Sequence, residues 1–99
     1  MQSQTESQVQ AGARTEQHVL YQYASCPFCQ RVLRYLAEAG IEIELRDVLR
    51  DAEARRELLE GGGSTQVPCL RIDTTQGDRR WLYESLDIIA YLRGYYQSG

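Results

Sequence analysis

Two cysteines separated by two residues, Cys26 and Cys29, are the residues of this sequence with the clearest chemistry. They stand in the stretch Ser25-Cys26-Pro27-Phe28-Cys29, between a β-like and a helix-like run. Proline lacks a backbone N–H and has a φ near helical values, so Pro27 suits the first position of a helix. Cys26 is then predicted to cap that helix, where free N–H groups and the helix dipole favour the thiolate. We expect Cys26 to be a reactive nucleophile and Cys29, one turn further on, to be its resolving thiol.

Other roles for the cysteine pair fit the sequence less well. A structural disulfide is the weaker interpretation, because three cysteines are an odd number and too few for a disulfide-stapled secreted domain. A zinc site needs two further ligands, and only Cys69 and His18 remain, neither at finger-like spacing. Cys69 is expected to be a buried, inert apolar residue in a central strand, with a regulatory thiol as the alternative. We expect His18 to be a solvated residue rather than a base.

Length and charge limit the remaining classes. A chain of 99 residues is long enough for one domain with a single core. The formal net charge of −3 argues against a nucleic-acid partner. No apolar run approaches the roughly 20 residues that a membrane-spanning helix needs, and the N-terminus lacks the features of a signal peptide. We therefore expect a cytoplasmic protein that does not bind membranes, and a monomer.

The rest of the chain supplies elements that can position the cysteine pair. Residues 1–17 are polar and without a sustained period, which predicts a disordered tail before a folded domain over residues 18–99. Within that domain Gly40 is a natural helix end, and Ile41 to Leu45 alternates as a strand with one covered face should. Strands are predicted over 18–23, 41–45, 67–72 and 80–83, and helices over 27–39, 51–60 and 85–95. This order predicts a small mixed sheet flanked by helices.

With the cysteine turn, the order of elements and a Val67-Pro68 step, the chain resembles a glutaredoxin from about Val19 to Tyr95. The motif of that family is Cys-Pro-aromatic-Cys, with Phe28 here in place of the more usual tyrosine. The resemblance implies an α/β thioredoxin-like fold, a four-stranded mixed sheet flanked by three helices in the order βαβαββα. It further implies that Pro68 is a cis-proline packed beside the nucleophilic cysteine, and that the backbone of Val67 pairs with the cysteinyl part of glutathione.

A third stretch, Tyr83-Glu84-Ser85, precedes the last predicted helix. Ser85 is a good N-cap, and the N–H groups behind it form a ready site for a carboxylate. Here the chain departs from ordinary glutaredoxins and is similar to the Glu-Ser step of glutathione S-transferase N-terminal domains. That resemblance implies that Glu84 and Ser85 hold the γ-glutamyl end of glutathione, although we expect no second helical domain of the transferase kind. The further glutathione contacts implied by the resemblance are Tyr23, Pro27 and Phe28.

A second departure concerns positive charge beside the cysteine turn. Many glutaredoxins have a lysine three residues ahead of the first cysteine, where Tyr23 stands in this chain, and the chain contains no lysine. Either an arginine such as Arg31 or Arg34 compensates, or the glycine carboxylate of glutathione is held more weakly. The sequence leaves open which group holds that carboxylate.

The resemblance implies a glutathione-dependent thiol-disulfide oxidoreductase. Cys26 would attack a disulfide of a protein or a glutathione mixed disulfide, and Cys29 would resolve the intermediate in protein substrates. Glutathione would be the co-substrate, the partners would be glutathionylated or disulfide-containing proteins, and no metal is expected. One alternative is a non-catalytic module that binds glutathione or an iron–sulfur cluster, although Pro27 and Cys29 differ from the Cys-Gly-Phe-Ser turn of cluster-binding relatives. Another is an interaction protein whose redox turn is vestigial.

Overall fold

The computed structural model of the protein describes residues 16–97. Most of the predicted tail, residues 1–15, lies outside this range. The predicted boundary at residue 17 is wrong by one residue, because strand β2 (Gln17–Gln22) begins at Gln17. Gln17 pairs with Asp73, the last residue of strand β4 (Cys69–Asp73), so the ladder extends β2 to match the full length of its partner.

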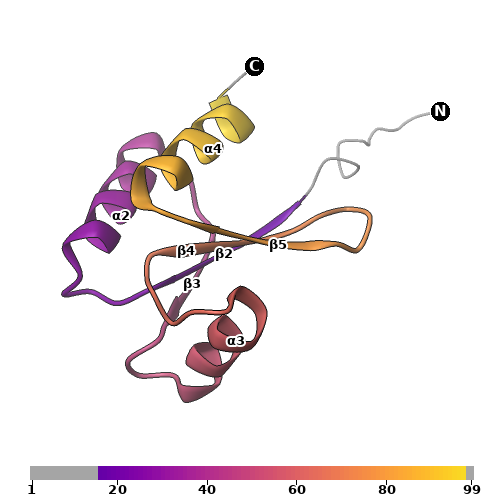
Figure 1. Ribbon diagram of the computed structural model, residues 1–99. Helices are drawn as coiled ribbons and strands as arrows, with labels where there is room; N and C mark the ends of the chain where they lie inside the picture. The colour runs from indigo at the N-terminus through magenta and orange to yellow at the C-terminus, as the bar shows by residue number, and fades with distance from the viewer. Residues whose placement is uncertain (1–15, 98–99) are drawn as a thin grey trace.

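Within residues 16–97, seven elements follow one another in the predicted order βαβαββα. The sheet has the strand order β3-β2-β4-β5, with β2 and β3 parallel and the other pairs antiparallel, so the predicted four-stranded mixed sheet is confirmed. Helices α2 and α4 cover one face of this sheet and α3 covers the other (Figure 1). The remaining bounds are α2 (Pro27–Ala39), β3 (Glu44–Asp47), α3 (Ala52–Gly62), β5 (Arg79–Tyr83) and α4 (Ser85–Gln97).

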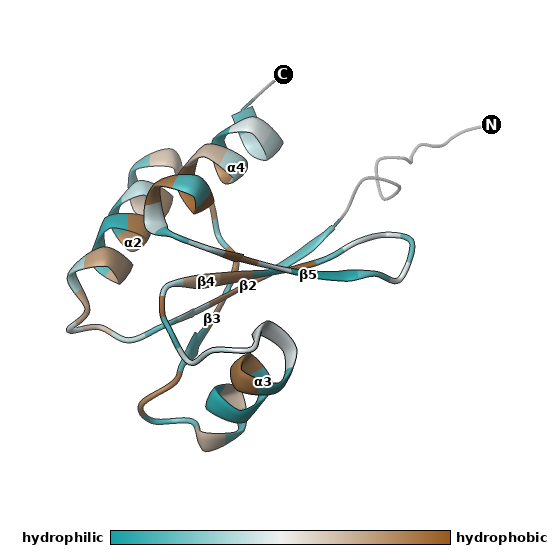
Figure 2. Ribbon diagram, in the orientation of Figure 1, coloured by the Kyte–Doolittle hydropathy of each residue, from teal (hydrophilic) through white to brown (hydrophobic). Residues whose placement is uncertain are grey.

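The two faces of the sheet bury two separate apolar clusters. Successive side chains of a strand point to opposite faces, so Leu20 joins one cluster while Val19 and Tyr21 join the other. Figure 2 shows the hydrophobic colour along the central strands β2 and β4 and the hydrophilic colour toward the tip of the β4–β5 hairpin. The cluster under α2 and α4 comprises Leu20, Val32, Leu36, Leu70, Ile72, Ile88, Ile89 and Leu92, and the cluster under α3 comprises Val19, Tyr21, Val48, Ala54, Leu58 and Cys69.

Helix α2 has the bounds predicted from its terminal residues. Pro27 is its first residue, and Gly40 ends it in the left-handed conformation with φ 71°. The N–H of Gly40 bonds the carbonyl oxygen of Ala37 at 3.3 Å, which satisfies one of the free acceptors at the helix end. Both ends of this helix are thus encoded by single residues with a strong local preference.

Two of the differences from the predicted bounds concern β3 and α3. The strand predicted over Ile41–Leu45 begins instead at Glu44, because the parallel ladder places Glu44 opposite Val19. Ile41 and Ile43 precede the strand and still pack, partly buried, against the cluster under α2 and α4.

The second difference is the end of α3, which was predicted at residue 60 and lies at Gly62. Asp51 caps the start of α3, with its carboxylate accepting from the N–H groups of Glu53 and Ala54. The helix stops at Gly63, whose φ of 87° lies in the left-handed region. Gly61 and Gly62 are therefore helical, and Gly63 ends the helix.

Candidate functional site

Cys26 occupies the N-cap of α2, as predicted. Its backbone is extended, and its Sγ accepts a hydrogen bond of 3.3 Å from the N–H of Cys29. The backbone N–H of Cys26 bonds the carbonyl oxygen of Tyr23 at 3.2 Å, which fixes the turn between β2 and α2. The sulfur of Cys26 therefore lies at the positive end of the helix dipole, beside an N–H group that can stabilise negative charge.

Cys29 differs from Cys26 although both belong to one helical turn. Its side chain is fully buried, and burial, followed by the neighbouring Cys26 side chain, raises the pKa of the Cys29 thiol to about 12. Cys29 is therefore a protonated thiol at neutral pH. Both cysteines, like Cys69, are free thiols in this structure. Cys26 is buried as well, with 6% of its surface exposed, so the two thiols differ in their place on α2, with Cys26 at the N-cap and Cys29 within the first turn.

The second segment of the site is the Val67-Pro68 step ahead of β4. The peptide bond between these residues is cis, as the family resemblance implies. Pro68 is buried and stands immediately before Cys69, the first residue of β4, where its missing N–H costs no hydrogen bond within the strand. The strand predicted over 67–72 therefore begins two residues later than expected, at Cys69. Val67 and Pro68 thus lie in irregular backbone directly before the first residue of the central strand β4.

The third segment is Glu84-Ser85, between β5 and α4. Ser85 was predicted to be the N-cap, but it is the first helical residue, and the carbonyl oxygen of Glu84 accepts the first helical bond from Ile88 at 2.9 Å. Glu84 has a φ of 76°, a conformation that favours glycine. The chain reverses at Glu84 in order to pass from the edge strand into a helix over the sheet, which explains why the capping position moved by one residue.

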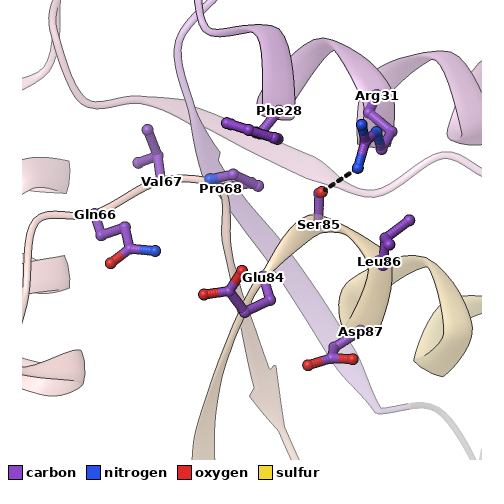
Figure 3. A pocket seen from close by; sticks show the side chains of 9 residues that line it. All are labelled: Phe28, Arg31, Gln66, Val67, Pro68, Glu84, Ser85, Leu86 and Asp87. Carbon is purple, nitrogen blue, oxygen red and sulfur yellow. Dashed lines mark hydrogen bonds between the residues drawn. The ribbon is translucent and has the colours of Figure 1, made fainter.

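These three segments enclose a pocket of about 350 Å³ (Figure 3). This volume is within the range of small-molecule sites, at its lower end. Five of the seven residues predicted to contact glutathione line the pocket, one or two from each segment: Phe28, Val67, Pro68, Glu84 and Ser85.

Tyr23 and Pro27 were predicted to contact glutathione, and the pocket wall contains neither of them. Tyr23 packs against the apolar cluster under α3, and Pro27 is an exposed residue at the first position of α2. Cys26 and Cys29 are also outside the wall, so Phe28 is the only residue of the Cys26-to-Cys29 turn that reaches the pocket.

Four residues of the wall were not predicted: Arg31, Gln66, Leu86 and Asp87. Arg31 could have been found from helical spacing, because residues three apart on a helix share a face and Phe28 had been assigned to the site. The sequence left Arg31 and Arg34 as equal candidates for a compensating positive charge. The structure places Arg31 in the wall of the pocket and leaves Arg34 exposed outside it.

The charged groups of the pocket are arranged around Ser85. The guanidinium of Arg31 donates a hydrogen bond of 3.3 Å from Nη1 to Oγ of Ser85, and it lies 5.5 Å from the centroid of the Phe28 ring. The carboxylates of Glu84 and Asp87 lie away from Arg31, on the other side of Ser85 (Figure 3). The pocket can therefore offer one positive and two negative groups to a ligand.

Two residues outside the pocket also test the sequence interpretation. The expectation that His18 is solvated is wrong: its side chain is 5% exposed and is held by the hydroxyls of Tyr91 and Tyr96, both at 2.9 Å. Cys69 is fully buried on the α3 side of the sheet, and burial raises the pKa of its thiol to about 11. This environment agrees with an inert thiol.

Within residues 16–97, no cluster of three or more His, Cys, Asp or Glu side chains is arranged to hold a metal ion. The described helices also include none that is both long enough and apolar enough to cross a membrane.

Comparison with known families identifies the domain. The family described as glutathione S-transferase, N-terminal domain, matches residues 25–93, which include all three segments of the pocket. The chain belongs to this family. The likeness predicted at Glu84-Ser85 agrees with the match, whereas the finer resemblance to glutaredoxins is not part of it. No curated protein matches this glutathione S-transferase N-terminal domain significantly.

Solved structures place the domain among transferase-like and thioredoxin-like folds. A thioredoxin-like protein is 25% identical with a TM-score of 0.58, and the match covers 77% of this chain and 99% of that one. The maleylacetoacetate isomerase of Anaeromyxobacter dehalogenans, with glutathione bound in its active site, is 26% identical with a TM-score of 0.61 over 81% of this chain. A glutathione transferase homologue from Drosophila mojavensis with bound glutathione is 24% identical with a TM-score of 0.66 over 83% of this chain, a likeness of fold. The matches cover 38% of the isomerase chain and 36% of the homologue chain.

Proposed function

We propose that this domain is a glutathione-dependent thiol-disulfide oxidoreductase with Cys26 as the nucleophile. The observation that carries the proposal is the pair of unlike thiols in one turn: Cys26 at the N-terminus of α2, and Cys29 buried with a thiol pKa of about 12. A thiolate attacks a disulfide sulfur, so a thiol placed at a helix N-terminus is suited to the first attack. The family match supports glutathione as the co-substrate, because glutathione is bound in solved structures of transferase-like relatives.

The proposed reaction with a glutathione mixed disulfide has two exchanges. The Cys26 thiolate attacks the glutathione sulfur, a Cys26–glutathione disulfide forms, and the substrate thiol leaves as a thiolate that takes a proton from water. The thiolate of a second glutathione then attacks the bound glutathione sulfur, which releases oxidised glutathione and restores the Cys26 thiolate. Neither exchange needs Cys29, whose thiol stays protonated. With a protein disulfide as the substrate, Cys26 would first form a mixed disulfide with one protein sulfur. Cys29 would then lose its proton and attack the Cys26 sulfur, which frees the protein thiol and leaves a Cys26–Cys29 disulfide. Two glutathiones would reduce that disulfide.

The pocket offers a proposed place for two of the three parts of the tripeptide. Val67 and the cis-Pro68 lie at the end of β4, where backbone groups can align the cysteinyl part of glutathione. Glu84 and Ser85 can hold the γ-glutamyl end, since an acid suits its ammonium group and a helix N-terminus suits its carboxylate. Phe28 joins this pocket to the turn that contains Cys26.

The test is the mass of intact protein after exposure to oxidised glutathione. The Cys29→Ser variant should gain one glutathione, mapped to Cys26, and the double variant with Cys26→Ser should gain none. A Cys69→Ser variant with the same Cys29→Ser background is the matched control and should still gain one. An adduct on Cys69, or no adduct in the Cys29→Ser variant, would overturn the assignment of the nucleophile.

Two other activities would have distinct signatures in the same preparation. Membership of the transferase family favours addition of glutathione to an electrophile as a second candidate, measured as thioether formation with an aryl halide. A non-catalytic module that binds an iron–sulfur cluster would be coloured as purified. A colourless protein that turns over a glutathionylated peptide, and loses this turnover in Cys26→Ser, would support the oxidoreductase against both.

A further inference from the structure

We propose that Arg31 is the anchor of the pocket for a ligand carboxylate, and that it makes the domain prefer γ-glutamyl thiols to thiols without a γ-glutamyl group. This inference deepens the proposed function and rests on it, since it takes glutathione as the ligand. The juxtaposition that carries it is an arginine of α2 in hydrogen-bond contact with the first residue of α4, inside the pocket.

The position of Arg31 is fixed by groups on two helices. Phe28, one turn earlier on α2, presents its ring 5.5 Å from the guanidinium carbon, a distance that permits a cation–π contact. Ser85 of α4 accepts a hydrogen bond of 3.3 Å from Nη1. The guanidinium is thus placed beside the N-terminus of α4 before a ligand arrives.

The positive charge of Arg31 is available to a ligand. A guanidinium has five N–H donors, and one of them is used at Ser85. Arg46, Arg56 and Arg71 each form two ion pairs, and Arg50 and Arg79 form one each, whereas no carboxylate within residues 16–97 forms an ion pair with Arg31. Arg31 is also the only basic residue in the wall of the pocket.

The groups around Arg31 complete a carboxylate site. Because the oxygen of Ser85 accepts from Arg31, its hydroxyl hydrogen is free to donate to a ligand. The first N–H groups of α4 have no acceptor within the helix, and Ser85, Leu86 and Asp87 at this end of the helix line the pocket. A carboxylate here would therefore receive donors from a guanidinium, a hydroxyl and a helix N-terminus together.

The acids of the pocket explain why the arginine decides the preference. Glu84 and Asp87 give the wall two negative charges, and Arg31 gives it one positive charge. Without Arg31, an anion at the start of α4 would meet only repulsion from side-chain charges. The amino-acid end of a γ-glutamyl residue has both an ammonium and a carboxylate, so it can pair with the acids and with Arg31. An isolated carboxylate can pair with Arg31 only.

The experiment compares three thiols, each supplied as its mixed disulfide with the same peptide and with glutathione as the common reductant: glutathione, γ-glutamylcysteine and cysteinylglycine. The Arg31→Met variant keeps the apolar stem and removes the charge, and Arg34→Met is the matched control on the same helix outside the pocket. We expect Arg31→Met to lower kcat/KM about tenfold for the two γ-glutamyl thiols, through KM, and to leave cysteinylglycine unchanged. Arg31→Lys should restore part of the loss, since lysine is charged but cannot bind a carboxylate with two parallel bonds.

The outcomes separate this inference from the proposed function. If the wild type reduces none of the three mixed disulfides, the proposed function fails, and this inference fails with it. If the wild type is active and Arg31→Met behaves like Arg34→Met with all three thiols, the inference fails alone. An equal loss with all three thiols would also overturn it, because Arg31 would then only hold Ser85 and α4 in place.

Discussion

The phenol oxygen of Tyr83 donates a hydrogen bond of 3.0 Å to the backbone carbonyl oxygen of Ser64. Ser64 lies in the connection that leads from α3 to Val67-Pro68, and Tyr83 is the last residue of β5 before Glu84-Ser85. One hydroxyl therefore links two of the three segments that enclose the pocket.

Removal of this hydroxyl should affect both stability and ligand affinity. We expect Tyr83→Phe to lower the free energy of unfolding by about 1 kcal/mol, because the Ser64 carbonyl loses its partner, and to raise KM for glutathione. Tyr96→Phe is the control, since it removes a hydroxyl bonded to His18 and distant from the pocket. Denaturant unfolding and steady-state kinetics measure the two effects. Equal values of KM in both variants would show that the Tyr83–Ser64 contact does not position the site.

The helical glycines of α3 should resist substitution for a steric reason. A Cβ added at Gly61 would overlap the indole ring of Trp81, and one added at Gly62 would overlap the hydroxyl of Tyr83. We expect Gly61→Ala to destabilise the domain by about 1–3 kcal/mol, as overpacking does. Gly94→Ala in α4 meets nothing within 4 Å and should instead stabilise the domain by about 0.5–1 kcal/mol. A stabilised Gly61→Ala variant in thermal unfolding would contradict the close packing of α3 on β5.

Glu84 should contribute to ligand binding at the expense of stability. Its φ of 76° is disfavoured for any residue with a side chain, so Glu84→Gly should raise the free energy of unfolding by about 1 kcal/mol while it weakens glutathione binding. Glu84→Ala keeps the strained conformation and removes the carboxylate, and should weaken binding without that gain. Calorimetric titration with glutathione and thermal unfolding measure the two properties separately. If both variants bind glutathione as the wild type does, the carboxylate is not a ligand group.

His18 should make the stability of the domain depend on pH. Burial lowers the pKa of His18 below its ordinary value of 6.5, and this effect exceeds the opposing influence of Glu16 and Asp73. As the pH falls, His18 therefore takes up a proton more readily in the unfolded chain than in the folded chain. The stability that the neutral His18 contributes is fully present above pH 6.5 and is lost as the pH falls below that value. The unfolding free energy of the wild type should fall toward that of His18→Gln between about pH 7 and about pH 5. Parallel pH curves for the two proteins would contradict this expectation.

The parts of the fold that could be predicted from sequence are those with a local cause. Pro27 and Gly40 impose their own backbone angles, and both ends of α2 were predicted to the residue. The position of β3 is set by its pairing with β2, which no local pattern encodes, so the alternation from Ile41 placed this strand too early. The end of α3 was predicted too early for a similar reason, because the residue that packs against Gly61, Trp81, is twenty residues away in the sequence.

The candidate site likewise contains some residues that could be predicted from the sequence and others that depend on how distant elements pack together. The N-cap position of Cys26 follows from Pro27, the residue after it, whereas the cis bond at Pro68 and the place of Glu84 were implied by the family resemblance. Arg31 was left open against Arg34, because the choice depends on where α4 lies relative to α2. His18 was misinterpreted for the same reason. Its partners are tyrosines more than seventy residues away, brought to it by the docking of the last helix on the sheet.

The strand order β3-β2-β4-β5 also leaves β3 and β5 at the edges of the described sheet. Within the described residues, β3 and β5 each have a neighbouring strand on one side only, and such open edges can pair with another chain. Strand β5 begins with two exposed arginines, Arg79 and Arg80, and β3 is only four residues long. A strand of another chain that paired with β5 would bury the charges of these arginines. A strand that paired with β3 could form only a short ladder. The arginines at the start of β5 thus act as a barrier to intermolecular β-pairing.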